Sequence, residues 1–218
     1  DEATAALYYK KSLQTWKKEA DDGDSKAALW AALVYERKLV PDSSPEKSVP
    51  YLLQAAESGN LTAQGLLAFK YRDGLGVPQD AAKAVEWFEK AASRKDLGAV
   101  MELGIMFRDG KYLPPDREKA FHWFEKGAEW KDPYSMAALA DMLLEGTPSA
   151  EQAARALALY REAAAAGYFP AALKAAELLQ NGKGGELDAD EAYRLLRRVA
   201  DATGDPKAMY MLAQVYYT

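Results

Sequence analysis

Histidine and cysteine, the residue types that most often act as catalytic bases, nucleophiles and zinc ligands, are scarce in this chain. His122 is the only histidine, and the chain has no cysteine. A catalytic triad or a zinc site would therefore need an unusual set of ligands. The carboxylates of Asp188, Asp190 and Glu191 stand where a helix is expected to begin, and the helix dipole favours negative charge there. These residues predict no catalytic site, no metal site and no cofactor.

Binding of phosphate or nucleic acid finds equally little support. Gly182, Gly184 and Gly185 do not form a Walker pattern and fall in an expected turn. The net charge of −5 and the pI near 5.1 disfavour nucleic acid and anionic lipid as partners. The sequence has no apolar run of the ~18 residues that a membrane span needs. The basic clusters are typical of solvated helix faces, and they comprise Lys17, Lys18, Arg194, Arg197 and Arg198.

The elements that would carry any site repeat along the chain. Alanine recurs every 36 residues, in a column formed by Ala20, Ala56, Ala92, Ala128, Ala164 and Ala200. A second small column contains Ala27, Ala63, Ala99, Ser135, Ala171 and, after a one-residue insertion, Ala208. A third column contains large side chains, namely Tyr35, Tyr71, Phe107, Leu143, Leu179 and Tyr216. A period of this length, in a chain that is 49% apolar, indicates a repeat protein with a continuous core.

Each unit is expected to contain two helices. Apolar residues spaced four and three apart, such as Ala63, Leu67 and Tyr71, form one face of a helix. The expected N-caps of the first helices are Asp24, Asn60, Asp96, Asp132 and Asp205, and those of the second are Ser44, Asp80, Asp116 and Asp188. The glycines expected to end helices in the left-handed conformation are Gly23, Gly59, Gly74, Gly110, Gly146, Gly167, Gly182 and Gly204. The pattern predicts a single all-α domain over 1–218, with units at 1–24 (partial), 25–60, 61–96, 97–132, 133–168, 169–205 and 206–218 (partial).

Residues 63–92 carry a resemblance to a known repeat family. The matching positions are Ala63, Leu67, Tyr71, Gly74, Gly76, Val77, Asp80, Lys83, Ala84, Trp87, Phe88, Lys90, Ala91 and Ala92. This set resembles the Sel-one-like repeat (SLR) family, a relative of the tetratricopeptide repeat, and the resemblance covers essentially the whole chain. It weakens in the first unit, at Lys38, Pro41 and Pro45, and in the fourth. The fourth unit has a changed turn at 146–148 and Leu159–Tyr160 in place of the tryptophan–aromatic pair.

The resemblance implies a right-handed α-solenoid that binds another protein and has no catalytic residues. Three classes of function stay open. The first is an immunity or inhibitor protein that neutralises a secreted antibacterial toxin, such as a type VI secretion phospholipase effector. The second is an assembly scaffold or adaptor in envelope polysaccharide export or signalling. The third, a hydrolase of cell-wall fragments, finds no active-site residues in the sequence.

The resemblance also implies that the first helix of each unit lines a concave face. The partner-binding residues expected there are Phe69, Arg72, Met101, Ile105, Arg108, Asp141, Glu145 and Glu177. An apolar patch rimmed by charge is typical of a protein-binding site. Alternatives stay open. The column of Leu29 and Met101 fits ordinary core equally well, and Trp130 or the open end at Tyr210 and Tyr216 could carry the contact instead.

The compartment follows less directly from the sequence. The chain starts at Asp1 without methionine, so we expect that an upstream segment has been removed. A cleaved signal peptide would place the protein in a bacterial periplasm, whereas a trimmed sequence would leave the cytoplasm possible. The absence of cysteine does not decide between them. The identity of the partner and the oligomeric state are left open.

Overall fold

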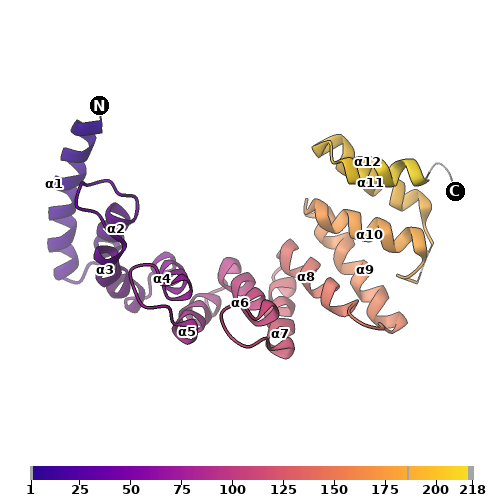
Figure 1. Ribbon diagram of the computed structural model, residues 1–218, viewed down its shortest axis with the longest axis horizontal. Helices are drawn as coiled ribbons and strands as arrows, with labels where there is room; N and C mark the ends of the chain where they lie inside the picture. Colours follow the sequence, from indigo (N-terminus) through magenta and orange to yellow (C-terminus); the bar gives the residue numbers. More distant parts are fainter. Residues whose placement is uncertain (1, 186, 216–218) are drawn as a thin grey trace. The chain divides into compact units, whose positions relative to one another are not determined.

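The computed structural model describes residues 2–185 and 187–215, which form twelve α-helices and no strand (Figure 1). The predicted all-α solenoid of helix pairs is confirmed. Tyr216, predicted both as a column residue and as part of an open end, lies outside the described residues. The helices are α1 (Glu2–Asp21), α2 (Ser25–Glu36), α3 (Pro45–Glu57), α4 (Leu61–Asp73), α5 (Ala81–Ala92), α6 (Leu97–Asp109), α7 (Arg117–Glu129), α8 (Pro133–Leu143), α9 (Ala150–Ala165), α10 (Phe169–Asn181), α11 (Ala189–Thr203) and α12 (Pro206–Val215).

The N-caps predicted for the first helix of each unit are confirmed by their hydrogen bonds. The side chains of Asp24, Asn60, Asp96, Asp132 and Asp205 each accept a backbone N–H from the first turn of the helix that follows. Each bond satisfies a donor that the helix itself leaves unpaired. Asp80 and Asp188 do the same for α5 and α11.

Two second helices begin in ways that the sequence did not predict. Ser44 precedes α3 in extended conformation, but its side chain makes no capping bond, and Pro45 fills the first helical position. The N–H of Lys47, which a side-chain cap would accept, donates instead to the backbone oxygen of Ser44 at 3.1 Å. A capping box that the sequence analysis missed starts α9: Ser149 Oγ accepts from Gln152 N, and Gln152 Oε1 accepts from Ser149 N.

The turn positions show where the chain must adopt positive φ. All eight glycines predicted to end helices do so, with φ between 65° and 96°. At Lys95 (φ 64°) and Lys131 (φ 62°) the same turn is made without glycine. These lysines occupy the column of Gly23, Gly59 and Gly167. A side chain in this conformation is strained by contact between its Cβ and the backbone.

The small columns form the interior of the helix pairs. Every member of the column that runs from Ala27 to Ala208 is at most 3% exposed, including Ser135. In the column of Ala20, four alanines are buried, and Ala128 and Ala200 are half-buried. Small side chains here let neighbouring helix backbones approach closely, which explains why alanine recurs at these positions.

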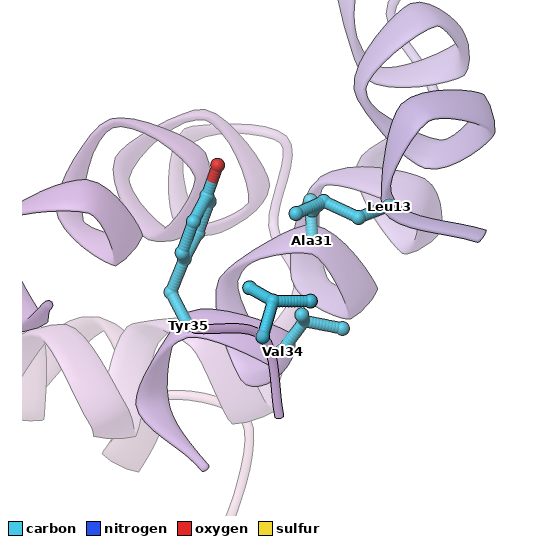
Figure 2. Close-up of a cluster of buried hydrophobic side chains, with 5 residues drawn as sticks. Leu13, Ala31, Val34 and Tyr35 are labelled. Atoms are coloured by element: carbon cyan, nitrogen blue, oxygen red, sulfur yellow. The ribbon is translucent and has the colours of Figure 1, made fainter. Parts of the chain in front are cut away.

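Contacts divide the chain into two compact units, Asp1–Asp116 and Arg117–Thr218. In the first, Leu13, Ala31, Val34, Tyr35 and Val40 form a buried cluster that joins α1, α2 and the loop after α2 (Figure 2). In the second, α8 to α12 pack in chain order, with a cluster formed by Ala164, Ala172, Val199 and Ala208. Each unit thus has its own core on which a surface site can be built.

Candidate functional site

The predicted site residues of the first unit lie on α4 and α6. Phe69 is half-buried and packs edge-on against Phe88 of α5, with ring centroids 5.1 Å apart. Met101 and Ile105 are half-buried on α6. Phe69 therefore combines partial exposure with a fixed support, which is what a binding surface needs.

Arg72 is held more tightly than the sequence suggested. Its Nε and Nη2 donate to the two carboxylate oxygens of Asp73, both at 2.8 Å, and its Nη1 donates to Glu102 Oε2 at 2.6 Å. The guanidinium carbon lies 4.7 Å from the ring centroid of Phe69 and 5.4 Å from that of Tyr112. The Tyr112 hydroxyl in turn donates to Asp73 Oδ1 at 3.0 Å. Arg72 is therefore fixed between two aromatic rings.

Electrostatics stabilise the same arrangement. The hydrogen bonds from Arg72 lower the pKa of the Asp73 carboxyl, and they raise the pKa of the guanidinium. The side chains of Arg72 and Glu102 are 17% and 16% exposed, so water screens their attraction less than at an open surface. Arg108 is partnered too, since its Nε donates to Asp109 Oδ1 at 2.6 Å.

Sequence reasoning missed Tyr112 and Glu102. Tyr112 comes from the loop between α6 and α7, where the helical period carries no information about which way a side chain points. Glu102 lies on α6, one residue after the predicted Met101, at a spacing of 30 from Arg72. We name the group Phe69, Arg72, Asp73, Glu102 and Tyr112 the arginine cluster.

The predicted acidic residues belong to the second unit and also have partners. Asp141 is exposed at the surface of α8, and its Oδ1 accepts a hydrogen bond from the Tyr160 hydroxyl at 2.5 Å. Burial is the main cause that raises the pKa of Tyr160, and the bond to Asp141 adds to it. Lys174 Nζ lies 3.8 Å from Asp141, and Arg117 Nη2 lies 3.1 Å from Glu145. Glu177 is exposed on α10.

The two predicted groups are thus placed within their own units. Phe69, Arg72, Met101, Ile105 and Arg108 lie in the first unit, and the three acidic residues lie in the second. That the groups act together on one partner stays a prediction. The alternative that the column of Leu29 and Met101 is ordinary core gains support from two further members of that column. Leu173 packs against a buried cluster, and Ala137 is 6% exposed.

A buried ion pair lies next to the arginine cluster in sequence, but it joins α4 to α2 and α3, whereas Arg72 joins α4 to α6. Lys70, with a side chain 5% exposed, lies 2.6 Å from Glu36 Oε1 and donates to Leu75 O. Ser48 of α3 also donates to Glu36 Oε1. The network links α2, α3 and α4, and such pairs fix one arrangement of helices because a lone buried charge is costly.

The histidine and the carboxylates do not group as a metal site in the described part of the chain. His122 is exposed on α7, where its ring packs edge-on against Trp123 at 5.4 Å. Within residues 2–185 and 187–215, no three histidine or carboxylate side chains group as metal ligands. None of the helices described there has the length and apolar character of a membrane crossing.

The Sel1 repeat model matches six stretches of the chain, at residues 26–60, 62–96, 98–129, 133–168, 170–203 and 206–218. The chain belongs to the Sel1 repeat family. The resemblance carried by residues 63–92 is therefore confirmed. No curated protein matches the chain in a comparison of whole proteins.

Solved structures agree with this membership. A protective antigen present in uropathogenic Escherichia coli strains, displaying an SLR fold, is 29% identical, with a TM-score of 0.76. The match covers 98% of this chain and 44% of that one, so this chain spans less than half of that relative. A Sel1 repeat protein from Oxalobacter formigenes is 23% identical, with a TM-score of 0.72 over 97% of this chain and 86% of that one, and shows the fold alone.

A third structure is similar at a lower level. The immunity protein PA5088 from Pseudomonas aeruginosa is 21% identical, with a TM-score of 0.44 over 82% of this chain and 67% of that one. Likeness at this level says nothing of function. Sel1 repeats as a class are protein-interaction modules, and six stretches of this chain match that repeat.

Proposed function

We propose that this Sel1 repeat protein is a non-catalytic module that binds another protein, and that the arginine cluster carries the contact in the first unit. The observation behind this proposal is the fixed position of Arg72 between Phe69 and Tyr112. Aromatic and arginine side chains supply most binding hot spots. Because three hydrogen bonds to carboxylates already hold the guanidinium, little side-chain entropy is lost when a partner binds.

The geometry gives each member of the cluster a distinct part. Arg72 is already neutralised by Asp73 and Glu102, so it serves less as a charge for the partner than as the support of the two rings. The rings of Phe69 and Tyr112, with Met101 and Ile105 of α6, form the apolar part of the contact. Met101 and Ile105 are half-buried and can lose further exposed area on binding.

The narrower form of the proposal is that the partner is a secreted antibacterial toxin, such as a type VI secretion phospholipase effector. The protein would then act as its immunity protein, in the bacterial periplasm where such a toxin meets it. Irregular repeats support a dedicated partner: α9 has 16 residues and α11 has 15, whereas α3, α5 and α7 have 12 or 13. Surfaces that differ between repeats can recognise one protein rather than many.

The test is affinity capture from the native host, followed by binding measurements with the purified partner. Phe69→Ala and Tyr112→Ala should each weaken binding by about tenfold or more, as expected for loss of a hot-spot residue. Tyr8→Ala, on α1, removes an exposed aromatic side chain of the same unit away from α4 and α6 and should leave affinity unchanged. Equal affinity for all three variants would contradict the proposed contact.

Two further measurements test the narrower form and the absence of catalysis. Expression of the captured partner in the periplasm should stop growth, and co-expression of this protein should restore it. A partner that assembles an envelope complex without toxicity would indicate a scaffold instead. His122→Ala should bind and protect as well as the unchanged protein, and a folded variant that had lost the function would overturn the non-catalytic model.

A further inference from the structure

A groove runs along one face of α1, away from every residue predicted for the site. Two pockets meet there, of about 480 and 290 Å³, and both are lined by Val40 and Pro41 from the loop after α2. The α1 residues that line them recur every three or four positions, which places them on one face of the helix. They are Glu2, Ala5, Ala6, Tyr9, Lys10, Leu13, Gln14 and Lys17.

The half of the groove near the start of α1 is apolar. Its lining includes Ala5, Ala6 and Tyr9 of α1, facing Leu39 and Val40 of the loop. Val40 and Leu13 belong to the buried cluster of the first unit, so the floor of the groove is part of a packed core. A preformed apolar floor of this kind suits an aliphatic or aromatic side chain.

The other half gathers hydrogen-bond donors. Lys17 lies 6.0 Å from the ring centroid of Tyr51, and interactions with Tyr51 and Tyr35 raise the pKa of its ammonium group. The two tyrosine rings stack with centroids 6.1 Å apart, which fixes both. Lys10 lines the same pocket two turns earlier on α1. A carboxylate placed here would meet two ammonium groups and a tyrosine hydroxyl.

The charges around the groove favour an anion. The carboxylate in the lysine half is Asp42, and it is already bound by Lys47. Lys38 adds a positive charge to the apolar half, and Glu2 lies at its far end. Lys10, Lys17 and Lys38 therefore outnumber the two carboxylates of the lining, in a protein whose net charge is −5.

We propose that this groove binds an acidic peptide segment of another protein, with an apolar side chain over Tyr9 and Val40 and a carboxylate between Lys10 and Lys17. From Ala6 to Lys17 the helix rises about 16 Å, at 1.5 Å per residue. An extended segment of about five residues covers that length. This second surface goes beyond the proposed function and does not depend on the arginine cluster.

Selection from a displayed library of random dodecapeptides tests the proposal without assuming a sequence. Peptides enriched on the full chain should carry Asp or Glu within about five residues of an aliphatic or aromatic residue, the span of the groove. An enriched peptide is then synthesised with a fluorescent label, and its affinity is measured by fluorescence polarisation. Enrichment of peptides without acidic residues, or of none, would overturn the proposal.

Matched lysine pairs on α1 provide the control. Lys10→Gln with Lys17→Gln should weaken binding of the labelled peptide by about tenfold or more, because charge-assisted hydrogen bonds are lost. Lys11→Gln with Lys18→Gln removes the same charge one residue along, outside the lining of the groove, and should change affinity less than about twofold. Equal losses of peptide affinity in both double variants would show that only net charge matters and would refute binding in the groove.

Two comparisons distinguish the groove from the arginine cluster and from a site for lipid or nucleic acid. Phe69→Ala should leave peptide affinity unchanged, so failure of the arginine cluster and failure of the groove can be told apart. Vesicles of anionic phospholipid and a single-stranded oligonucleotide should not displace the peptide, and displacement by either would overturn the assignment to a protein segment. Circular dichroism and thermal melting verify that each variant is folded.

Discussion

At the scale of single residues, Gln64 of α4 is the clearest departure from the repeat. The equivalent residues of four other units are apolar and buried, namely Ala28, Val100, Met136 and Ala172. Gln64 Nε2 donates to Ala56 O at 3.1 Å, but Oε1 is buried with no partner. A buried carbonyl oxygen without a donor destabilises the folded state.

Replacing Gln64 by methionine should therefore stabilise the protein by about 1 kcal/mol. The volume is nearly conserved, and Ala56 O keeps the bond from Gly59 N. The midpoint of urea unfolding reports the change, with Gln64→Ala as the control that leaves a cavity and lowers stability. A lower midpoint for the methionine variant would mean that the amide is satisfied in solution.

Tyr160 gives a residue-scale prediction about pH. Its raised pKa means that the folded state holds the phenol proton more tightly than the unfolded chain, whose tyrosines ionise near the ordinary value of 10.0. The stability that this proton contributes is complete below pH 10 and is lost as the pH rises above it.

Tyr160→Phe should abolish the part of the loss of stability above pH 10 that comes from ionisation of this tyrosine in the unfolded chain. At neutral pH the variant should be about 1 kcal/mol less stable, because the hydrogen bond to Asp141 is gone. Between pH 10 and 11 the difference from the unchanged protein should shrink. The midpoints of urea unfolding of both proteins, measured at neutral pH and between pH 10 and 11, give this difference. A difference in stability that stays constant or grows with pH would contradict a raised pKa of Tyr160 in the folded state.

At the scale of elements, the turns between helix pairs show how the repeat tolerates substitution. Lys95 and Lys131 adopt the left-handed conformation that glycine adopts in the same column. The backbone bond is also conserved, since Lys95 N donates to Ala92 O at 2.9 Å and Gly59 N donates to Ala56 O at 3.0 Å. The helix pair on either side evidently specifies the turn strongly enough to hold a strained residue there.

Lys95→Gly should relieve this strain and raise the free energy of unfolding by about 1 kcal/mol. Gly59→Ala, which introduces a side chain at the equivalent turn, should lower it by a similar amount. Thermal melting of both variants measures the two changes in stability. If Lys95→Gly proved destabilising, the lysine side chain would have to make a stabilising contact that outweighs the strain.

Elements were also what the sequence could predict best. N-caps such as Asp96 and turn glycines such as Gly74 act on backbone groups within a few residues, so their spacing alone identifies them. Ser149 was missed because the loop at 146–148 departs from the repeat, although Gln152 three residues later is the usual partner in a capping box. The prediction for Ser44 was wrong because the N–H of Lys47 bonds to the backbone oxygen of Ser44 and not to its side chain.

At the scale of the whole molecule, the sequence predicted which helices form but not how charged side chains pair. Arg72 was expected to face a partner, but it bonds to Glu102, 30 residues away, and lies over Tyr112, which belongs to a loop. The polar network of Lys70, Glu36 and Ser48 was not foreseen at all. Periodicity reports which face a residue occupies, and pairing between repeats depends on distances that periodicity does not contain.

Within each unit the main helix–helix contacts join helices consecutive in the chain. Chains with mostly local contacts lose little loop entropy before contacts form, and helical proteins of this kind fold in about microseconds to milliseconds. Stopped-flow refolding followed by tryptophan fluorescence should therefore complete most of its amplitude within about ten milliseconds. A main phase lasting seconds would show that contacts distant in sequence limit folding.

The 36-residue spacing of the buried alanines also has a meaning for the gene. A crossover between the codons of Ala56 and Ala92 deletes or duplicates 36 codons in frame, and the product loses or gains one complete helix pair. Both ends of such an inserted pair meet the small side chains that they would meet in the parent. The step from Ala171 to Ala208 is 37 residues because one residue is inserted between Ala200 and Ala208. A crossover between these two codons still joins equivalent positions, so the helices on both sides keep their register. Recombination between equivalent alanines can therefore lengthen or shorten this protein by whole helix pairs.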